Sequence, residues 1–214
     1  MKIDHRTVGA FEENCYLLSD EVTGRGVLID PGDEGEVLVE MLRLSGITLD
    51  AIWLTHAHVD HIGAVAHVRR HVAVPVYLHP LDLPYYTRLS ARAAEMYGIP
   101  FEQPDGPDRD LADGDVVRCG DLSFTVMHVP GHAPGLVSFN GHGVAFGGDL
   151  LFAGSIGRTD LPLGSPVDMD ASLERIATLP DETVVYPGHG PTTTIGREKQ
   201  TNPFLTGRAR AVRR

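Results

Sequence analysis

Histidine and aspartate residues follow predicted strands at four places along the chain, and this pattern limits how the chain can fold. A run of four such residues comes after the apolar segment 51–54, and single residues follow the strand-like segments 123–129, 144–146 and 183–186. Because strand ends let a rigid sheet aim side chains into one cleft, we expect these residues to meet. They are His56, His58, Asp60, His61, His132, Asp149 and His189.

The run His56-Ala57-His58-Val59-Asp60-His61 has the spacing of a metal site. In an extended chain, residues two apart point to the same side, so His56 and His58 are expected to bind one ion together. Asp60 and His61 lie at the turn into the next helix and suit a second ion. The alternatives are that Asp60 only caps that helix and that each histidine is an ordinary core or surface residue. The density of the run favours metal, and imidazole and carboxylate without thiolate suit zinc, iron or manganese.

The remaining three residues of the set share a local context of glycine and proline. His132 lies in Pro-Gly-His-Ala-Pro-Gly, Asp149 follows Gly-Gly, and His189 lies in Pro-Gly-His-Gly-Pro. Glycine permits unusual backbone angles and a close approach of the chain to an ion. Any one of these segments could be an ordinary turn, but three of them favour a site. A carboxylate has two oxygens, so Asp149 is the expected bridge between two three-residue clusters.

The order of predicted elements indicates two β-sheets packed together with helices outside, in one domain spanning residues 1–214. A Pro-, Asp- and Gly-rich connection covers residues 100–115, and Asp30-Pro31-Gly32 is a predicted turn. Strands are predicted at 3–8, 14–18, 26–29, 51–54, 75–78, 116–117, 123–129, 136–139, 144–146 and 183–186. Helices are predicted at 36–44, 62–72, 80–97, 168–179 and 195–201.

Composition narrows the class of protein. The net charge of −11 disfavours nucleic acid as a partner. Cys15 and Cys119 are the only cysteines, too few for a disulfide framework, and are expected to be core residues or free thiols. The chain has no secretory signal and no apolar run of transmembrane length, so we expect a soluble, cytoplasmic protein. The Arg-rich tail 207–214 is expected to be solvated, with an anionic docking patch as the alternative.

The pattern His-x-His-x-Asp-His followed by separate His, Asp and His resembles the metallo-β-lactamase superfamily over nearly the whole chain. The resemblance implies an α+β fold, a four-layer αββα sandwich with the site at one edge. It implies one metal on His56, His58 and His132, another on Asp60, His61 and His189, and Asp149 bridging with a water or hydroxide. The segment Asn14-Cys15-Tyr16 and the segments around Asp149 and His189 look like glyoxalase II-like proteins.

The chain departs from glyoxalase II in two respects and in these resembles a short subgroup of that family. Only 25 residues follow His189, too few for the C-terminal helical domain that helps those enzymes hold glutathione. Gly190-Pro191 also replaces the Glu and Tyr that usually follow the last ligand there.

The candidate ligands predict a dinuclear metal-dependent hydrolase, and the resemblance to glyoxalase II-like proteins implies that it cleaves a glutathione-type thioester such as S-lactoylglutathione. We expect two divalent ions, zinc first, with iron or manganese as alternatives, and we assign Asp60 a catalytic role. A thiolate has a reference pKa near 8.5, so it can leave without a general acid. The alternatives are a mononuclear iron persulfide dioxygenase, a lactone or β-lactam hydrolase, a nuclease and a binding protein with an inactive site. We expect neither a nucleic acid nor a membrane as partner.

Arg158 is the predicted substrate-binding residue. It lies in a loop soon after Asp149, and the matching loop of glyoxalase II-like proteins supplies a basic residue to glutathione. An acidic protein needs local positive charge to hold an anionic substrate, and guanidinium binds carboxylate through two hydrogen bonds. The alternative is that Arg158 only pairs with Asp160 and shapes the loop.

Overall fold

The computed structural model describes residues 1–211. Its first sheet contains six strands in sequential order; the first three are antiparallel and the last three run parallel to the third. They are β1 (Lys2–Val8), β2 (Glu13–Asp20), β3 (Arg25–Ile29), β4 (Thr48–Trp53), β5 (Val76–Leu78) and β6 (Arg109–Asp110).

The second sheet has the order β14-β13-β10-β9-β8-β7, in which only the β10–β13 pair is parallel. Its strands are β7 (Val116–Cys119), β8 (Leu122–His128), β9 (Val137–Gly141), β10 (Val144–Gly148), β13 (Val184–Pro187) and β14 (Thr193–Thr194). A small hairpin, β11 (Leu151–Phe152) with β12 (Ser155–Ile156), follows β10.

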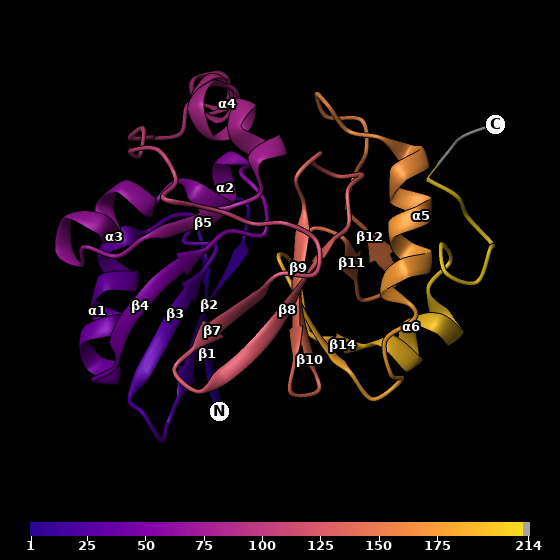
Figure 1. Ribbon diagram of the computed structural model, residues 1–214. Coiled ribbons are helices and arrows are strands. Elements are labelled where there is room, and N and C mark those ends of the chain that lie inside the picture. The colour runs from indigo at the N-terminus through magenta and orange to yellow at the C-terminus, as the bar shows by residue number, and fades with distance from the viewer. Residues whose placement is uncertain (212–214) are drawn as a thin grey trace.

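The two sheets pack face to face with helices on both outer sides, which confirms the predicted four-layer sandwich (Figure 1). Between the sheets lies an aromatic-rich core in which the rings of Trp53 and Phe139 are 5.1 Å apart. One outer side carries α1 (Gly35–Ser45), α2 (Val59–Ile62), α3 (Val65–His71) and α4 (Ser90–Tyr97); the other carries α5 (Pro166–Ile176) and α6 (Ile195–Thr201).

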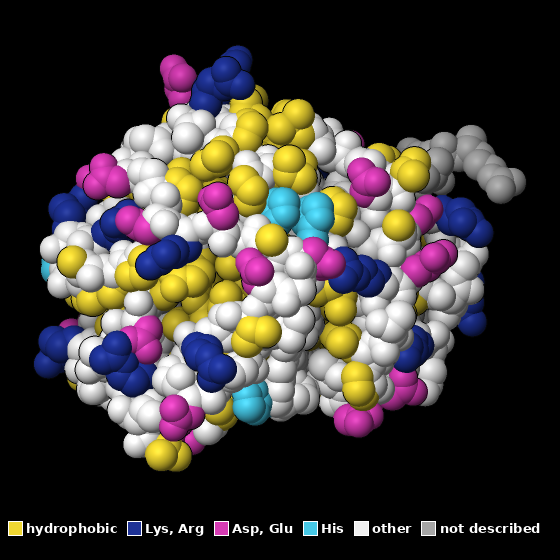
Figure 2. Space-filling view, viewed as in Figure 1, with side chains coloured by type: hydrophobic (Ala, Val, Ile, Leu, Met, Phe, Trp, Pro, Cys, Tyr) yellow, Lys and Arg dark blue, Asp and Glu magenta, His cyan; other side chains and the backbone are white. Residues whose placement is uncertain are grey.

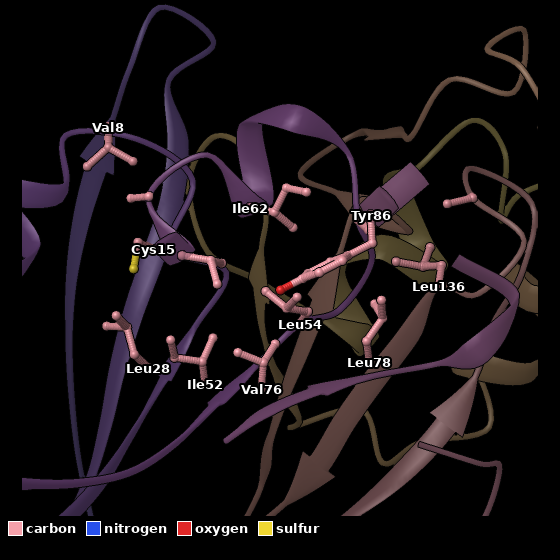
Figure 3. Packing of buried hydrophobic residues seen from close by; sticks show 14 of the residues in the cluster. Val8, Cys15, Leu28, Ile52, Leu54, Ile62, Val76, Leu78, Tyr86 and Leu136 are labelled. Carbon is pink, nitrogen blue, oxygen red and sulfur yellow. The ribbon is translucent and has the colours of Figure 1, made fainter. Parts of the chain in front are cut away.

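A second core lies between the first sheet and its helices. Leu28, Ile52 and Val76 of that sheet face Ile62 of α2 and Tyr86 (Figure 3). Tyr86 is fully buried and donates its hydroxyl to the carbonyl of Asp105 at 2.8 Å. This packing fixes the segment between β5 and α4 against the end of β4, where the first predicted ligands lie.

One predicted helix is broken in the structure, and another is continuous but changes its helix type. Residues 62–72 divide into α2 and α3 near Gly63, where an added Cβ would lie 2.3 Å from the carbonyl oxygen of Gly32. Residues 80–97 are helical without a gap, as predicted, but the helix type changes along them from the 3-10 helix η1 (Pro80–Asp82) through the π-helix η2 (Tyr85–Leu89) to α4. Pro84 lies in the first turn, where a missing amide hydrogen is tolerated.

The cysteine prediction is confirmed, because Cys15 and Cys119 are both buried and free. No helix within residues 1–211 has the length and apolar character to cross a membrane. The predicted Arg-rich tail, residues 207–214, lies partly outside the described residues. Within them, the backbone amide of Ala211 donates to the side chain of Asp170 of α5 at 3.2 Å.

Candidate metal centre

The loops that follow β4, β8, β10 and β13 converge at one edge of the sandwich and bring all seven predicted residues together. The loops after β10 and β13 are neighbours because those strands are parallel, and the amide of Gly188 donates to the carbonyl of Gly148 at 2.9 Å. A Cβ on Gly188 would lie 2.2 Å from Asp149 Oδ1, so only glycine fits between the two loops.

His56, His58 and His132 form what we call the deep cluster. His58 Nδ1 lies 3.1 Å from His56 Nε2 and 2.8 Å from His132 Nε2, and all three side chains are buried. Burial lowers the pKa of each imidazole, that of His58 to about 3. The rings are therefore neutral at pH 7 and have lone pairs available for a cation.

Asp60, His61 and His189 form the outer cluster. Asp60 Oδ2 lies 3.2 Å from His189 Nε2 and 3.9 Å from His61 Nε2. His61 is fully buried, whereas the His189 side chain is 25% exposed. Burial lowers the pKa of His61, but the charges of Asp149 and Asp60 raise it further, so the net pKa is well above the ordinary value. A cation that binds the outer cluster therefore has to displace the proton that His61 holds.

Asp149 lies between the two clusters. Its Oδ2 is 3.3 Å from His132 Nε2 of the deep cluster and 3.5 Å from His189 Nε2 of the outer cluster. Its Oδ1 is 3.4 Å from His61 Nε2. One carboxylate thus contacts ligand atoms of both clusters, which is the geometry expected of a bridge.

The residues present fit a pair of metal ions. The three donor atoms of each cluster lie within 4.8 Å of one another. His61 Nε2 and Asp149 Oδ1 are buried without a hydrogen-bond partner among residues 1–211, and such atoms are costly unless something binds them. Asp30, His56 and His61 also lie close together, but Asp30 contacts His61 Nδ1, the ring nitrogen that faces away from Asp149.

Hydrogen bonds from the surrounding chain fix the histidine rings. Nδ1 of His61 lies 3.0 Å from Asp30 Oδ2, and Nδ1 of His56 lies 3.1 Å from the hydroxyl of Thr55, which itself donates to Asp30. Nδ1 of His132 and Nδ1 of His189 meet the backbone carbonyls of Arg158 and Phe11 at 2.8 and 3.0 Å. Such partners orient metal-binding imidazoles.

Asp82 is a second buried acid that supports the site. Its carboxylate accepts the amide of Ala57 at 2.8 Å and the amide of Gly135 at 2.5 Å. Ala57 lies between His56 and His58, and Gly135 ends the loop that carries His132, so Asp82 ties together two loops of the deep cluster. Burial raises the pKa of Asp82 to about 6, although both amides lower it.

Asn14 and Tyr16 of β2 fasten the loop of His189. The Tyr16 hydroxyl donates to the carbonyl of Pro187 at 2.7 Å, and the Asn14 side-chain amide donates to that of Gly190 at 2.8 Å. This contact gives the Asn14-Cys15-Tyr16 segment a physical role at the site.

A cavity of about 940 Å3 opens beside the centre, and His58, Asp60, His132, Asp149 and His189 are in its lining. Arg158 lies in its lining too, as predicted from its loop. The guanidinium binds Asp160 through two hydrogen bonds of 2.7 and 2.9 Å, and its side chain is 60% exposed. The pairing proposed as the alternative is therefore formed, at the rim of the cavity.

Residues 8–189 match the model of the metallo-beta-lactamase superfamily, so the chain belongs to this superfamily. A curated relative, the hydroxyacylglutathione hydrolase GloC of Haemophilus influenzae, is 35% identical and covers 98% of this chain and 100% of its own. The solved structure of TTHA1623 in a di-iron-bound form has a TM-score of 0.88 at 48% identity, over 94% of this chain and 100% of that one. The structure of the BLEG-1 B3 metallo-beta-lactamase has a TM-score of 0.90 at 40% identity, over 96% and 100%.

Proposed function

We propose that this protein is a cytoplasmic hydrolase with a dinuclear metal centre that cleaves a glutathione-type thioester such as S-lactoylglutathione. The observation that carries the proposal is the position of Asp149, whose two oxygens contact ligand atoms of both clusters. His56, His58 and His132 would hold one ion, Asp60, His61 and His189 the other, and Asp149 both. Nitrogen and oxygen donors of this kind accept zinc, iron or manganese. When bound, such ions lower the pKa of a coordinated water to about 7 and polarise a carbonyl oxygen.

Asp60 has the role of a fixed negative charge at the cavity. Burial raises its pKa, but His61 and the hydrogen bond from His189 lower it more, so the carboxylate stays ionised at neutral pH. Asp60 would therefore accept a hydrogen bond from the attacking water and orient it. It would not act as the general base that takes up the proton of this water. Tyr85 also lines the cavity; burial raises its pKa to about 12, so the phenol stays protonated.

A thioester suits this site because its thiolate can leave without a proton donor. The likeness to GloC over the whole of both chains supports the same substrate class. The likeness to the BLEG-1 B3 metallo-beta-lactamase favours a β-lactam as the second candidate substrate.

One experiment separates these candidates. Protein reconstituted with zinc, iron or manganese is assayed with S-lactoylglutathione, a lactone and a chromogenic cephalosporin, and oxygen uptake is followed with glutathione persulfide. We expect two ions per chain, release of thiol and no oxygen consumption. Oxygen uptake without thiol release, or turnover of the cephalosporin alone, would overturn the thioester proposal.

A further inference from the structure

An apolar stripe on α4 faces the cavity. Leu89 at the end of η2 and Ala93, Met96 and Tyr97 of α4 have the spacing of one helix face, and all four line the cavity. Such a stripe normally packs into a core, yet the side chains of Met96 and Tyr97 are 73% and 51% exposed. The neighbouring face of α4, with buried Ser90 and Ala94, already packs against the protein. Leu89 packs partly against the core, but the exposure of Met96 and Tyr97 is not explained by folding.

The stripe extends to the outer cluster through Phe11. The ring of Phe11 packs edge-on against Tyr97 at 5.5 Å, and its backbone carbonyl meets His189 Nδ1 at 3.0 Å. Phe11 is itself 40% exposed. Hydrophobic side chains gather at the end of the molecule where α4 lies (Figure 2). Contiguous exposed apolar surface is typical of ligand-binding grooves and of interfaces, and here it lines the cavity beside the metal centre.

The opposite wall of the cavity is apolar as well. Phe152, Ile156 and Leu161 line it, and the ring of Phe152 lies 6.0 Å from that of His189. Besides the predicted ligands, the charged residues of the lining are Arg92 and Glu95, which have opposite signs, and Arg158, which is paired with Asp160. The space next to the centre is therefore suited to an apolar group.

We propose that the enzyme prefers thioesters whose acyl group is bulky and apolar, an aromatic or medium-chain acyl group, and that the α4 stripe and Phe11 contact this group. The inference rests on the proposed thioester hydrolysis. Arg158, on the loop after β12, and Arg92, on α4, are the lining residues able to attract the carboxylates of the thiol part. The apolar side chains of the stripe are then left to contact the acyl group.

The test is a series of glutathione thioesters with lactoyl, acetyl, butyryl, hexanoyl and phenylacetyl groups. Each buried methylene is expected to raise kcat/KM about three- to fourfold. In Met96→Ser/Tyr97→Ser, kcat/KM should fall at least about tenfold more for the hexanoyl than for the acetyl ester. Leu44→Ser, at an exposed apolar position of α1 outside the cavity lining, is the matched control and should behave like the wild type.

A second readout does not depend on catalysis. Calorimetry on metal-free protein should show S-hexylglutathione binding at least about tenfold more tightly than S-methylglutathione, and this difference should disappear in the double variant. The inference is wrong if kcat/KM does not rise with the length of the acyl group, or if it rises equally in the double variant. Thioester hydrolysis itself would stand in either case. If the double variant changes the oligomeric state and leaves the acyl series intact, the stripe binds a second copy and the inference is wrong. Absence of thiol release from every ester rejects the proposed function and the inference with it.

Discussion

The deep cluster and the outer cluster both contain histidines, but they differ in charge and in access to solvent. The deep cluster has three neutral, buried imidazoles whose pKa values are lowered by burial. The outer cluster contains the carboxylate of Asp60, and its histidines have raised pKa values because Asp60 and Asp149 outweigh the effect of burial. The two halves of one centre would therefore hold ions of unequal affinity, and only the outer ion competes with protons near neutral pH.

The surrounding residues differ in the same way. Asp82 reaches the deep cluster alone, through backbone amides, whereas Asp30 contacts His61 of the outer cluster directly and His56 of the deep cluster through Thr55. Asp149 is common to both clusters. Variants at these positions can therefore separate the two halves of the centre.

The largest effect is expected for Asp149→Ala. Loss of this carboxylate removes an oxygen ligand from both clusters and leaves His61 Nε2 without its neighbour at 3.4 Å. We expect the two ions to be lost together and kcat/KM to fall at least about a thousandfold. Metal content after dialysis, measured beside thiol release, checks this. His189→Ala is the control and should lose only the outer ion. An Asp149→Ala protein that retains one tightly bound ion would show that the clusters are independent.

An intermediate effect, selective for one cluster, is expected for Asp82→Asn. An asparagine side chain has one acceptor oxygen, so either Ala57 or Gly135 loses its partner. We expect the deep ion to bind roughly 10- to 100-fold more weakly and the outer ion to be almost unaffected. Asp30→Asn is the comparison variant and should weaken both ions, because Asp30 contacts His61 directly and His56 through the hydroxyl of Thr55.

The two steps of metal release are resolved by titration with a chelator. Each step is assigned by comparison with His58→Ala and His189→Ala, which remove one ligand from one cluster each. Equal weakening of both ions in Asp82→Asn would contradict a role confined to the deep cluster, and a stability loss without a change in either affinity would show that Asp82 is structural only.

The sequence could predict residues that belong to a local pattern, but not residues that act through contacts with distant parts of the chain. The spacing of His56 to His61 is local, and glycine and proline mark the other three ligand loops, so the candidate ligands and the sandwich are readable from the chain. Asp30 and Asp82 contact residues 25 to 53 positions away, and neither the predicted turn at Asp30 nor the predicted helix at Asp82 gives a local sign of such a contact. The two-residue strands β6, β11, β12 and β14 are too short to show periodicity.

The smallest effect is expected for Arg158→Ala, which should change neither ion. The contact of Arg158 with His132 is made by the backbone carbonyl, so it survives the substitution and the metal content should stay the same. If the guanidinium binds a substrate carboxylate, it has to leave Asp160, and each exposed ion pair contributes at most about 1 kcal/mol, so the net gain is smaller than that. We therefore expect KM for glutathione thioesters to rise by less than about fivefold. Asp160→Ala is the opposing variant: it releases the guanidinium and should lower KM. Steady-state kinetics with S-lactoylglutathione at low ionic strength measures both, because salt screens exposed charges. An unchanged KM in both variants would mean that Arg158 serves only to shape the loop through Asp160 and to present its carbonyl to His132.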